Sequence, residues 1–337
     1  MVGRIFEGVC SKTKVLITGG AGFIGSHLAE ALAKNDEVVV FDNLSTGQEE
    51  NLKDFLGKSS TRMVVGSVLD RQKLEPLVEQ ADIVYHLAAV VGVDRVIRYP
   101  RATLAVNIDG TRNVVDLCRQ SGSKLVLAST SEVYGKNQDV PLAEDDSTWL
   151  GPTTVPRWCY AVSKLADEHL ALASAKEMTV VIVRYFNCYG PRIDPAGYAS
   201  VIALFIDQAL RGEPITVYGD GSQTRSFTYV ADTVAATVAA GAYNGTGVFN
   251  VGRAEEISID DLARLIREST ASDSPIVHQS FPARWGRFEE TRRRVPNISR
   301  AREALGFEAE TELIDGIDKT VRWARERLSE VSTGEVA

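Results

Sequence analysis

Tyr160 and Lys164, in the sequence YAVSK, are four residues apart and could form a catalytic pair. Residues at positions i and i+4 of a helix lie one above the other on the same face. An ammonium group beside a phenol favours the phenolate, so a tyrosine in this setting can act as a base nearer neutral pH. The same spacing is common on solvated helix faces. Its significance therefore depends on the strand that precedes this helix.

That strand ends in a second group of reactive side chains, in LASTSEVYG at residues 127–135. A strand buried on both faces is normally apolar and is closed by turn residues. Here the apolar run leads instead into Ser129, Thr130, Ser131 and Glu132. Ligands of parallel α/β sheets bind outside the carboxyl ends of the strands. We therefore expect these four side chains to lie where chemistry occurs.

The sequence VLITGGAGFIGSH contains a glycine-rich turn, with Gly19, Gly22 and Gly25 between an expected strand and an expected helix. Glycines at such a turn let the backbone approach a pyrophosphate that rests on the helix N-terminus. Asp42 follows at the end of the next strand, seventeen residues after Gly25. A carboxylate there can hydrogen-bond the adenosine ribose and repel a 2′-phosphate. The pattern predicts binding of NAD rather than NADP.

The elements that must position these groups alternate between short β-branched runs and amphipathic helical stretches. Such alternation predicts an α/β fold, a Rossmann-like doubly wound parallel sheet with helices on both faces. The expected strands are 14–18, 37–42, 63–65, 83–86, 125–129 and 179–184, and the expected helices are 22–34, 101–121, 160–176 and 311–328.

The pattern loosens after residue 185 into segments punctuated by glycine and proline, which predicts a smaller, irregular C-terminal substrate-binding lobe. The expected division is an N-terminal extension (1–13), a dinucleotide-binding domain (14–185, completed by part of 227–252), a substrate lobe (186–330) and a tail (331–337).

Composition narrows the possible partners. The 337 residues carry a formal net charge of −8, which disfavours nucleic acid and anionic membranes as partners. No stretch approaches the roughly 18 apolar residues of a membrane span, and the first residues lack the apolar core of a signal peptide. The four cysteines and four histidines are scattered without a CxxC pair, so we expect no metal site and no disulfide framework. These features favour the cytoplasm.

Taken together, the motifs resemble the extended short-chain dehydrogenase/reductases, the family of NAD-dependent nucleotide-sugar epimerases, dehydratases and decarboxylases. The resemblance covers nearly the whole chain. Its motifs are TGGAGFIG, DN at 42–43, HLAA at 86–89, TSEVYG, YAVSK, RYFNCYGPR, VYGDGSQTRSFTYV and LGF at 305–307. One departure is Ser67, where the family usually has an aspartate near the adenine.

The resemblance implies a role for each matching residue. Tyr160 would be the base, Lys164 would hold the nicotinamide ribose, and Thr130 or Ser131 would bind the sugar O4. A UDP-sugar would be the substrate, and the family usually forms homodimers through helices corresponding to 101–121 and 160–176. Around NAD the resemblance places Gly19, Gly22, Phe23, Ile24, Gly25, Asp42, Asn43, Leu87, Ala88 and Ala89, and around the nucleotide sugar it places Asn187, Arg192 and Arg225.

Three stretches favour one branch of this family. PRWCY, GPRID and RRRVPNI resemble their counterparts in UDP-glucuronate decarboxylases, as does the pair Ser131-Glu132. The resemblance places Arg294 at the reacting end of the substrate, with Glu132 nearby. It implies oxidation at C4, loss of carbon dioxide, and formation of UDP-4-keto-pentose or UDP-xylose.

Two alternatives remain open at this point. Some presumed 4-epimerases also carry SEVYG and a similar basic stretch, so a UDP-sugar or UDP-uronate 4-epimerase is the nearest one. A catalytically silent dinucleotide sensor is a more remote one, because this fold also serves regulatory binding proteins. An intact Tyr160 and Lys164 argue against a sensor.

Overall fold

The computed structural model describes residues 12–58, 60–194, 200–280 and 289–333. A seven-stranded sheet forms the centre of the larger lobe, and every neighbouring pair of strands is parallel. In spatial order the strands are β11 (Gly247–Val251), β6 (Val180–Tyr185), β5 (Lys124–Thr130), β4 (Ile83–His86), β1 (Lys14–Thr18), β2 (Glu37–Asp42) and β3 (Thr61–Val65). This order confirms the predicted doubly wound sheet.

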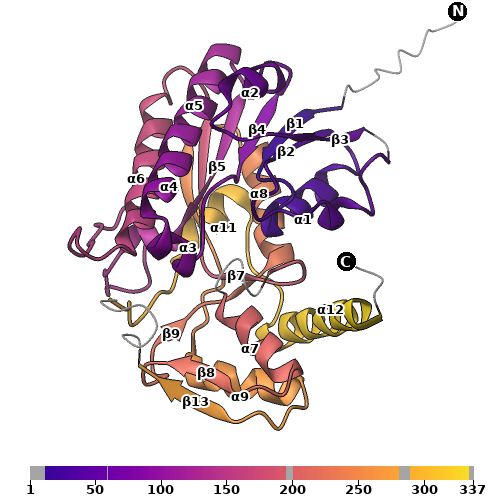
Figure 1. Cartoon of the computed structure of the whole chain (residues 1–337). Helices are drawn as coiled ribbons and strands as arrows, with labels where there is room; N and C mark the ends of the chain where they lie inside the picture. Colours follow the sequence, from indigo (N-terminus) through magenta and orange to yellow (C-terminus); the bar gives the residue numbers. More distant parts are fainter. Residues whose placement is uncertain (1–11, 59, 195–199, 281–288, 334–337) are drawn as a thin grey trace, which may run out of the picture.

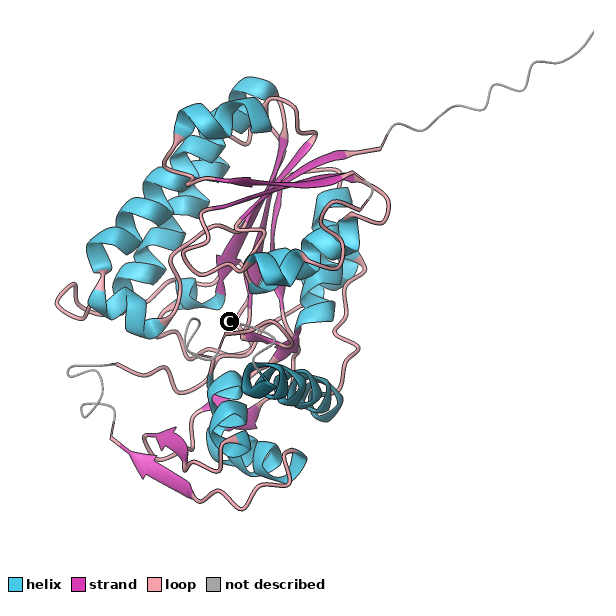
Figure 2. Cartoon of the chain, turned by 45° about the vertical axis from the view of Figure 1, so that its right-hand side comes forward, coloured by secondary structure: helices cyan, strands magenta, loops and turns pink. Residues whose placement is uncertain are grey.

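Helices cover both faces of the sheet, and each face has its own apolar core (Figure 2). Burial on both faces explains why the strands are almost continuously apolar. One face carries α1 (Phe23–Leu32), α8 (Val230–Ala242) and α11 (Ser299–Leu305), with the short turn η1 (Glu49–Leu52) beside α1. The other layer contains α2 (Arg71–Val78), α3 (Val93–Arg98), α4 (Pro100–Leu104), η2 (Ala105–Asp109), α5 (Gly110–Ser121) and α6 (Trp158–Ala173).

The smaller lobe lies beyond the carboxyl ends of the large sheet (Figure 1). It has its own core between three helices and a two-stranded sheet, which includes Phe205, Leu262 and Ile317. Its elements are α7 (Val201–Leu210), α9 (Ile259–Ser269), α12 (Leu313–Thr333), β8 (Ile215–Tyr218) with β13 (Ile276–Gln279), β9 (Thr224–Arg225) with β12 (Ile257–Ser258), and β7 (Cys188–Tyr189) with β10 (Thr228–Tyr229).

The chain passes between the lobes several times. It returns to the large lobe for α8 and β11, where β11 adds an edge strand to the sheet beside β6. It returns again for α11, which packs against β11 and α8. The expected substrate lobe at 186–330 is therefore interrupted by α11 as well as by 230–251. None of the described helices is long and apolar enough to cross a membrane.

One expected helix differs from the structure in an informative way. The stretch 101–121 contains α4, a π-helical turn (η2) and α5 instead of one regular helix. Asn107 lies in the π turn and is buried, with its side chain bonded to the backbone of Val90 and to the Ser163 hydroxyl on α6. The wider turn lets a polar side chain point inward, and π turns of this kind often lie near functional sites.

Candidate active site

The glycine turn lies at the point where the strand order of the sheet reverses, between β1 and β4. Loops leave the sheet in opposite directions there, which opens a crevice for a ligand. Gly19 has a φ of +72°, and a Cβ at this position would lie 2.7 Å from the backbone nitrogen of Ala88. A Cβ on Gly25 would collide with the carbonyl oxygen of Gly19. The glycines thus bring the loop, the start of α1 and residues 87–89 into close contact.

Asp42 ends β2 next to this turn and is almost fully buried. Its carboxylate accepts hydrogen bonds from the backbone nitrogens of Ala21, at 3.0 Å, and Leu44, at 2.8 Å. Burial raises the pKa of Asp42 against the opposing effect of these hydrogen bonds. A carboxylate has about four acceptor positions, so it can still receive ribose hydroxyls. Asn43 uses its side-chain oxygen to accept from the backbone nitrogen of Ser45.

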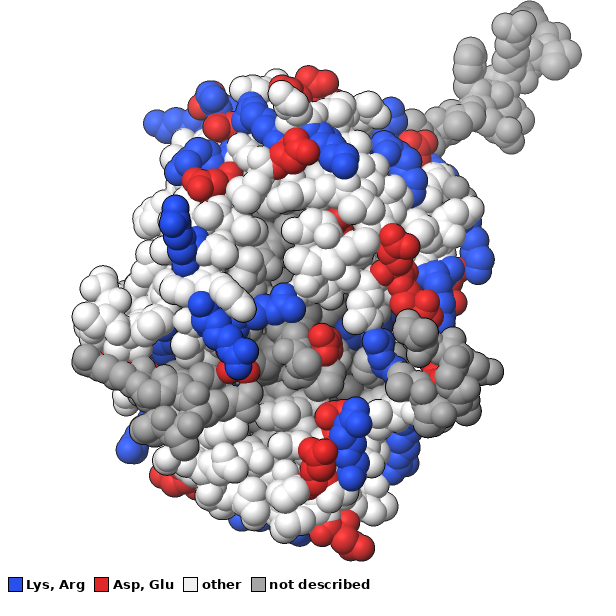
Figure 3. Space-filling view, in the orientation of Figure 1, with Lys and Arg blue, Asp and Glu red and all other residues white. Residues whose placement is uncertain are grey.

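A large cleft of about 1080 Å³ lies between the two lobes, at the carboxyl ends of the strands. Its lining brings together five of the residues selected from the sequence. These are Glu132, Tyr160, Asn187, Arg225 and Arg294. Acidic and basic side chains are interspersed on the face of the molecule shown in Figure 3.

Tyr160 reaches the cleft from the first turn of α6, and Lys164 follows on the same helix. Lys164 is almost completely buried and does not line the cleft. Thr130 ends β5, and its hydroxyl accepts from the backbone nitrogen of Glu132 at 3.2 Å, which caps the short helix η3 (Ser131–Tyr134). Ser131 is buried. Within η3, Glu132 lines the cleft, whereas Ser131 and Tyr134 are buried.

Glu132 is held between two arginines. Arg294 donates to its Oε1, and Arg157 donates to its Oε2 at 3.1 Å. Burial opposes ionisation of Glu132, but the charges and hydrogen bonds of Arg294 and Arg157 outweigh it and lower the pKa of this carboxyl group to about 2. Glu132 is therefore a fixed, ionised group at the strand end.

Arg157 lies in the wall of the cleft, where it contacts Glu132. Its side chain is only 7% exposed, stacks on the Trp158 ring at 4.8 Å from the centroid, and donates to the backbone oxygen of Glu289. Arg157 stands three residues before Tyr160 in PRWCY, one of the stretches that resemble UDP-glucuronate decarboxylases. The sequence did not indicate that its partner would be Glu132.

Arg225 and Asn187 lie on the smaller-lobe side of the cleft. Arg225 forms an ion pair with Glu290, a cleft residue that sequence reasoning missed. Asn187 has a φ of +34° and donates from its side chain to the backbone oxygen of Ser226 at 2.8 Å. This bond fixes Asn187 next to the loop that carries Arg225.

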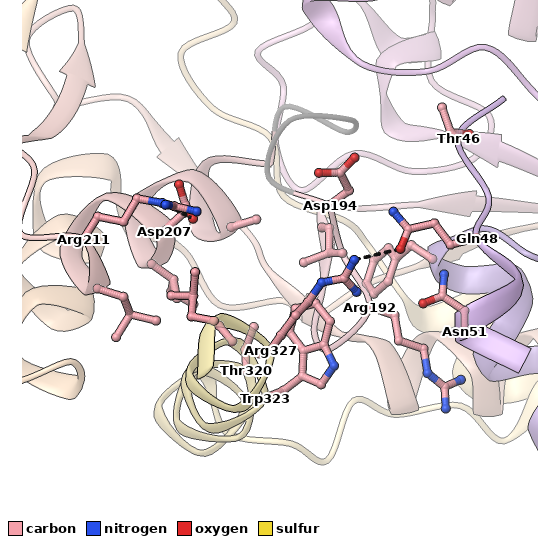
Figure 4. Close-up of a pocket in the computed structure, with 17 residues that line it drawn as sticks. Thr46, Gln48, Asn51, Arg192, Asp194, Asp207, Arg211, Thr320, Trp323 and Arg327 are labelled. Atoms are coloured by element: carbon pink, nitrogen blue, oxygen red, sulfur yellow. Dashed lines mark hydrogen bonds and ion pairs between the residues drawn. The ribbon is translucent and has the colours of Figure 1, made fainter. Parts of the chain in front are cut away.

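Arg192, for which the resemblance implies a place at the nucleotide sugar, does not line the large cleft. It lines a second cavity of about 220 Å³ between η1, α7 and α12, and it is absent from the lining of the large cleft (Figure 4). Its Nη2 pairs with Glu30 of α1 at 2.6 Å. Arg327 and Gln48 bridge the same cavity with a 2.8 Å hydrogen bond. The left-handed backbone at Arg192, with a φ of +66°, turns its side chain toward α1.

Comparison with known proteins identifies the family. The sequence profile of the NAD dependent epimerase/dehydratase family matches residues 15–252, well over half of the chain. The chain belongs to this family. Its members are NAD-dependent enzymes, so the cofactor predicted from the glycine turn and Asp42 is confirmed.

Two curated relatives illustrate how far the family likeness extends. The UDP-N-acetyl-alpha-D-glucosaminuronate decarboxylase of Bacillus cytotoxicus is 42% identical over 319 residues, which cover 94% of this chain and 98% of the relative. The UDP-glucuronic acid decarboxylase 1 of Xenopus tropicalis is 37% identical over 94% of this chain and 73% of the relative.

Solved structures show the same fold. The UDP-glucose 4-epimerase of Thermotoga maritima, solved with UDP-glucose, aligns with a TM-score of 0.85 and 32% identity over 93% of this chain and 99% of that one. MoeE5, solved with UDP-glucuronic acid and NAD, aligns with a TM-score of 0.80 and 31% identity over 93% and 99%.

The residues of this chain fit an NAD molecule at the glycine turn. No side chain caps the start of α1 and no acidic residue lies in its first turn, so its backbone N–H groups suit a pyrophosphate. Gly22, Phe23 and Ile24 would present these groups, Asp42 and Asn43 would face the adenosine ribose, and Leu87, Ala88 and Ala89 would border the crevice.

Asp42→Ala should weaken discrimination between NAD and NADP by about tenfold or more, the scale of a hydrogen bond to a charged group. The variant removes both the acceptor for the ribose hydroxyls and the charge that repels a 2′-phosphate. Titration of each cofactor into the cofactor-free protein measures the two dissociation constants. Asp42→Asn is the matched control for shape, because it removes the charge and keeps one side-chain oxygen that can accept from the backbone nitrogen of Ala21 or of Leu44. Equal affinity of the unmodified protein for both cofactors would contradict the assignment.

Proposed function

We propose that the protein is an NAD-dependent UDP-glucuronate decarboxylase that oxidises C4 of the sugar and releases carbon dioxide, giving UDP-4-keto-pentose or UDP-xylose. The observation that carries this proposal is the cluster of Glu132, Arg157 and Arg294 in the same cleft as Tyr160. A neutral hexose has no charged group at C6 on which two buried guanidiniums and one half-buried carboxylate could act. A sugar acid does.

The named relatives support the same activity. The curated proteins from Bacillus cytotoxicus and Xenopus tropicalis carry the name of a uronate decarboxylase, and each match covers 94% of this chain. MoeE5 was solved with UDP-glucuronic acid in its structure. These names support a UDP-hexuronate substrate and leave the substituent at sugar C2 to experiment.

The first step would be oxidation at C4. NAD supplies the acceptor for the C4 hydride. Tyr160 would take the proton from the C4 hydroxyl, with Thr130 or Ser131 helping to orient that oxygen. Lys164, one helical turn after Tyr160 on α6, would hold the nicotinamide ribose and favour the Tyr160 phenolate. Asn187 and Arg225 would hold the diphosphate.

The second step would be loss of the C6 carboxylate. The ketone at C4 makes the sugar a β-keto acid, so the electrons of the C5–C6 bond pass into an enolate as carbon dioxide leaves, and a proton then adds to C5. Arg294 would bind the carboxylate, because it lines the cleft and a guanidinium matches a carboxylate in charge and geometry. Tight binding alone would oppose departure as a neutral gas. The fixed negative charge of Glu132 would counter it by repelling the carboxylate.

The pKa of Glu132 favours this electrostatic role over a proton relay. With a pKa of about 2, the carboxyl group is almost never protonated near neutral pH. It is therefore a poor donor for the proton that returns to C5.

The decisive experiment is incubation of the NAD-loaded protein with UDP-glucuronate and, separately, with UDP-N-acetylglucosaminuronate and UDP-glucose. Mass spectrometry should show no change in mass of UDP-glucose. UDP-glucuronate should lose about 44 mass units, the mass of carbon dioxide, if the hydride returns to C4 and UDP-xylose forms, or about 46 if the product is UDP-4-keto-pentose and two hydrogens stay with NADH and a released proton. Loss of carbon dioxide from the N-acetylated substrate alone would move the proposal to that sugar. A C4-epimerised sugar of unchanged mass would replace the decarboxylase with a 4-epimerase.

A 4-epimerase is the second candidate, because its fold and its Tyr160 chemistry would be the same. The Thermotoga maritima 4-epimerase shares this fold over almost its whole length. An epimerase would use the same Tyr160 chemistry and then return the hydride to the other face of the sugar. An epimerase of neutral sugars would have no carboxylate for Glu132 and its two arginines to act on, whereas a UDP-uronate 4-epimerase would, and the mass of the product separates the latter from a decarboxylase.

We further propose a homodimer in the cytoplasm. Val162 and Leu172 on α6 are exposed apolar side chains, at 42% and 37%, on a helix that the family uses for association. The described cysteines, Cys118, Cys159 and Cys188, are free thiols, which suits a reducing compartment. Sedimentation at micromolar concentration should give twice the chain mass. A monomer would contradict the proposed dimer.

A further inference from the structure

Asp167 contacts Lys164 in the interior of the large lobe. Lys164 Nζ donates to Asp167 Oδ2 at 2.9 Å, and both residues belong to α6. The Lys164 side chain is 4% exposed and that of Asp167 is 0% exposed. Burial raises the pKa of Asp167, while the charge and hydrogen bond of Lys164 act in the opposite direction. An ion pair in such a place costs desolvation energy that its own attraction must offset.

Other charged groups near this pair have partners of their own. Glu168 is bonded to Arg184 and to the Ser129 hydroxyl. On the cleft side, the charge of Glu132 is shared between Arg157 and Arg294.

His86 lies on the sheet side of the pair. It is buried between the hydroxyls of Thr18, at 2.7 Å, and Thr111, at 2.9 Å. Burial, and after it the charge of Lys164, lowers the pKa of His86 to about 3, so the ring is neutral near neutral pH. Among the described groups, Asp167 is therefore the negative charge that directly meets the Lys164 ammonium.

We propose that Asp167 is a positioning residue that holds Lys164 in the buried face of α6 and sets how much positive charge Lys164 presents to Tyr160. This inference rests on the proposed role of Tyr160 as the base. A buried ammonium with no counter-charge would act on the phenol with its full field, whereas one paired with a carboxylate acts with a reduced field. Asp167 then moderates the acidity of Tyr160 while stabilising the charged lysine.

Asp167→Asn separates the effect of the negative charge of Asp167 from the effect of its hydrogen bond with Lys164. The amide has the shape of the carboxylate and keeps an oxygen for Lys164, but it removes the negative charge. Lys164 should then act on Tyr160 without compensation. The phenol of Tyr160 should ionise at a pH lower by about one unit, and the acid limb of the pH profile of kcat should move in the same direction.

The readout is the absorbance of phenolate in the NAD-loaded full chain during a pH titration. Subtracting the titration of the matching Tyr160→Phe variant isolates Tyr160 from the other tyrosines. This measurement needs no substrate, so it succeeds or fails independently of which sugar the enzyme converts. Asp261→Asn is the control, because Asp261 also pairs with a base three residues away, Arg264, but on the exposed surface of α9. It should leave the titration of Tyr160 unchanged.

A double-mutant cycle tests whether Asp167 acts through Lys164. The titration of Lys164→Gln/Asp167→Asn should match that of Lys164→Gln alone. Burial raises the pKa of Asp167 and Lys164 opposes this, so without the ammonium the buried Asp167 carboxyl group is neutral, as the amide is. This comparison also remains informative if Asp167→Asn does not fold, since the double variant leaves no unpaired buried charge. An unchanged or upward-shifted ionisation of Tyr160 in Asp167→Asn, or a double variant that differs from Lys164→Gln, would overturn the proposal.

Discussion

Tyr160→Phe should reduce oxidation of the sugar at C4 by about 10³-fold, the scale of losing a positioned general base. The phenylalanine keeps the ring at the start of α6 and removes only the oxygen that accepts the C4 hydroxyl proton. The measurement is the single-turnover rate of NADH formation from UDP-glucuronate, followed by absorbance. Binding of UDP and of NAD should stay within about threefold of the parent, because neither depends on proton transfer.

A matched substitution separates this effect from general damage. Tyr243→Phe makes the same chemical change at the C-terminal end of α8, outside the lining of the cleft. It should oxidise the sugar at the parent rate. If Tyr160→Phe turned over at a near-normal rate, the base would have to be another group and the proposed mechanism would fail at its first step.

Glu132→Gln should slow carbon dioxide release by about 10²-fold while C4 oxidation continues, the scale of losing one fixed electrostatic group. NADH should accumulate with the undecarboxylated 4-keto sugar, because the ketone forms but the carboxylate stays bound to Arg294. Quenched-flow sampling of carbon dioxide, together with NADH absorbance, measures both steps on one sample. Glutamine is preferred to alanine because it keeps the shape of the side chain and one oxygen that can accept from Arg157 or Arg294, while it removes the negative charge.

The pH dependence of the same step distinguishes the two roles of Glu132. A carboxyl group with a pKa of about 2 is ionised throughout the range above about pH 4. An electrostatic Glu132 therefore contributes no limb to the pH profile of carbon dioxide release above that value. A limb that disappears in Glu132→Gln would show that Glu132 transfers a proton.

Ionised Glu132 should stabilise the folded protein near neutral pH, and this contribution should be lost in acid. Its pKa is lower in the folded protein than the ordinary value near 4.3, so the unfolded chain binds the proton more readily. The stabilisation is complete above about pH 5 and is lost as the pH falls toward 2.

Much of the fold, and the placement of Tyr160 and Lys164 on one helix, could be predicted from the sequence because the signals for them are local. The strand at 14–18, the strand at 37–42 and the strand at 83–86 match β1, β2 and β4 residue for residue. Their apolar runs are short, are bounded by glycine or polar residues, and alternate with stretches of helical spacing. The type of each element can therefore be predicted from residues that are close together in the sequence. Tyr160 and Lys164 share a helix face because four residues make about one helical turn.

The environment of Glu132 depended on tertiary structure. Its two partners come from 25 residues and 162 residues away along the chain. The arginines could be named from their motifs, but only the fold shows that both converge on one carboxylate. The position of Arg192, which shares its motif with the cleft residue Asn187, also depends on the fold, which places it at the second cavity. A left-handed backbone position turns it toward Glu30.

The burial of Asp167 and its ion pair could not be predicted from the sequence. Its position three residues after Lys164 is visible in the sequence and would normally indicate an exposed helical ion pair. The structure buries both side chains because α6 packs against β5 and α5, and water is excluded from that layer. Spacing along a helix determines which residues are neighbours. Whether their charges act in water or in a low-dielectric interior is decided only by the elements that pack against that helix.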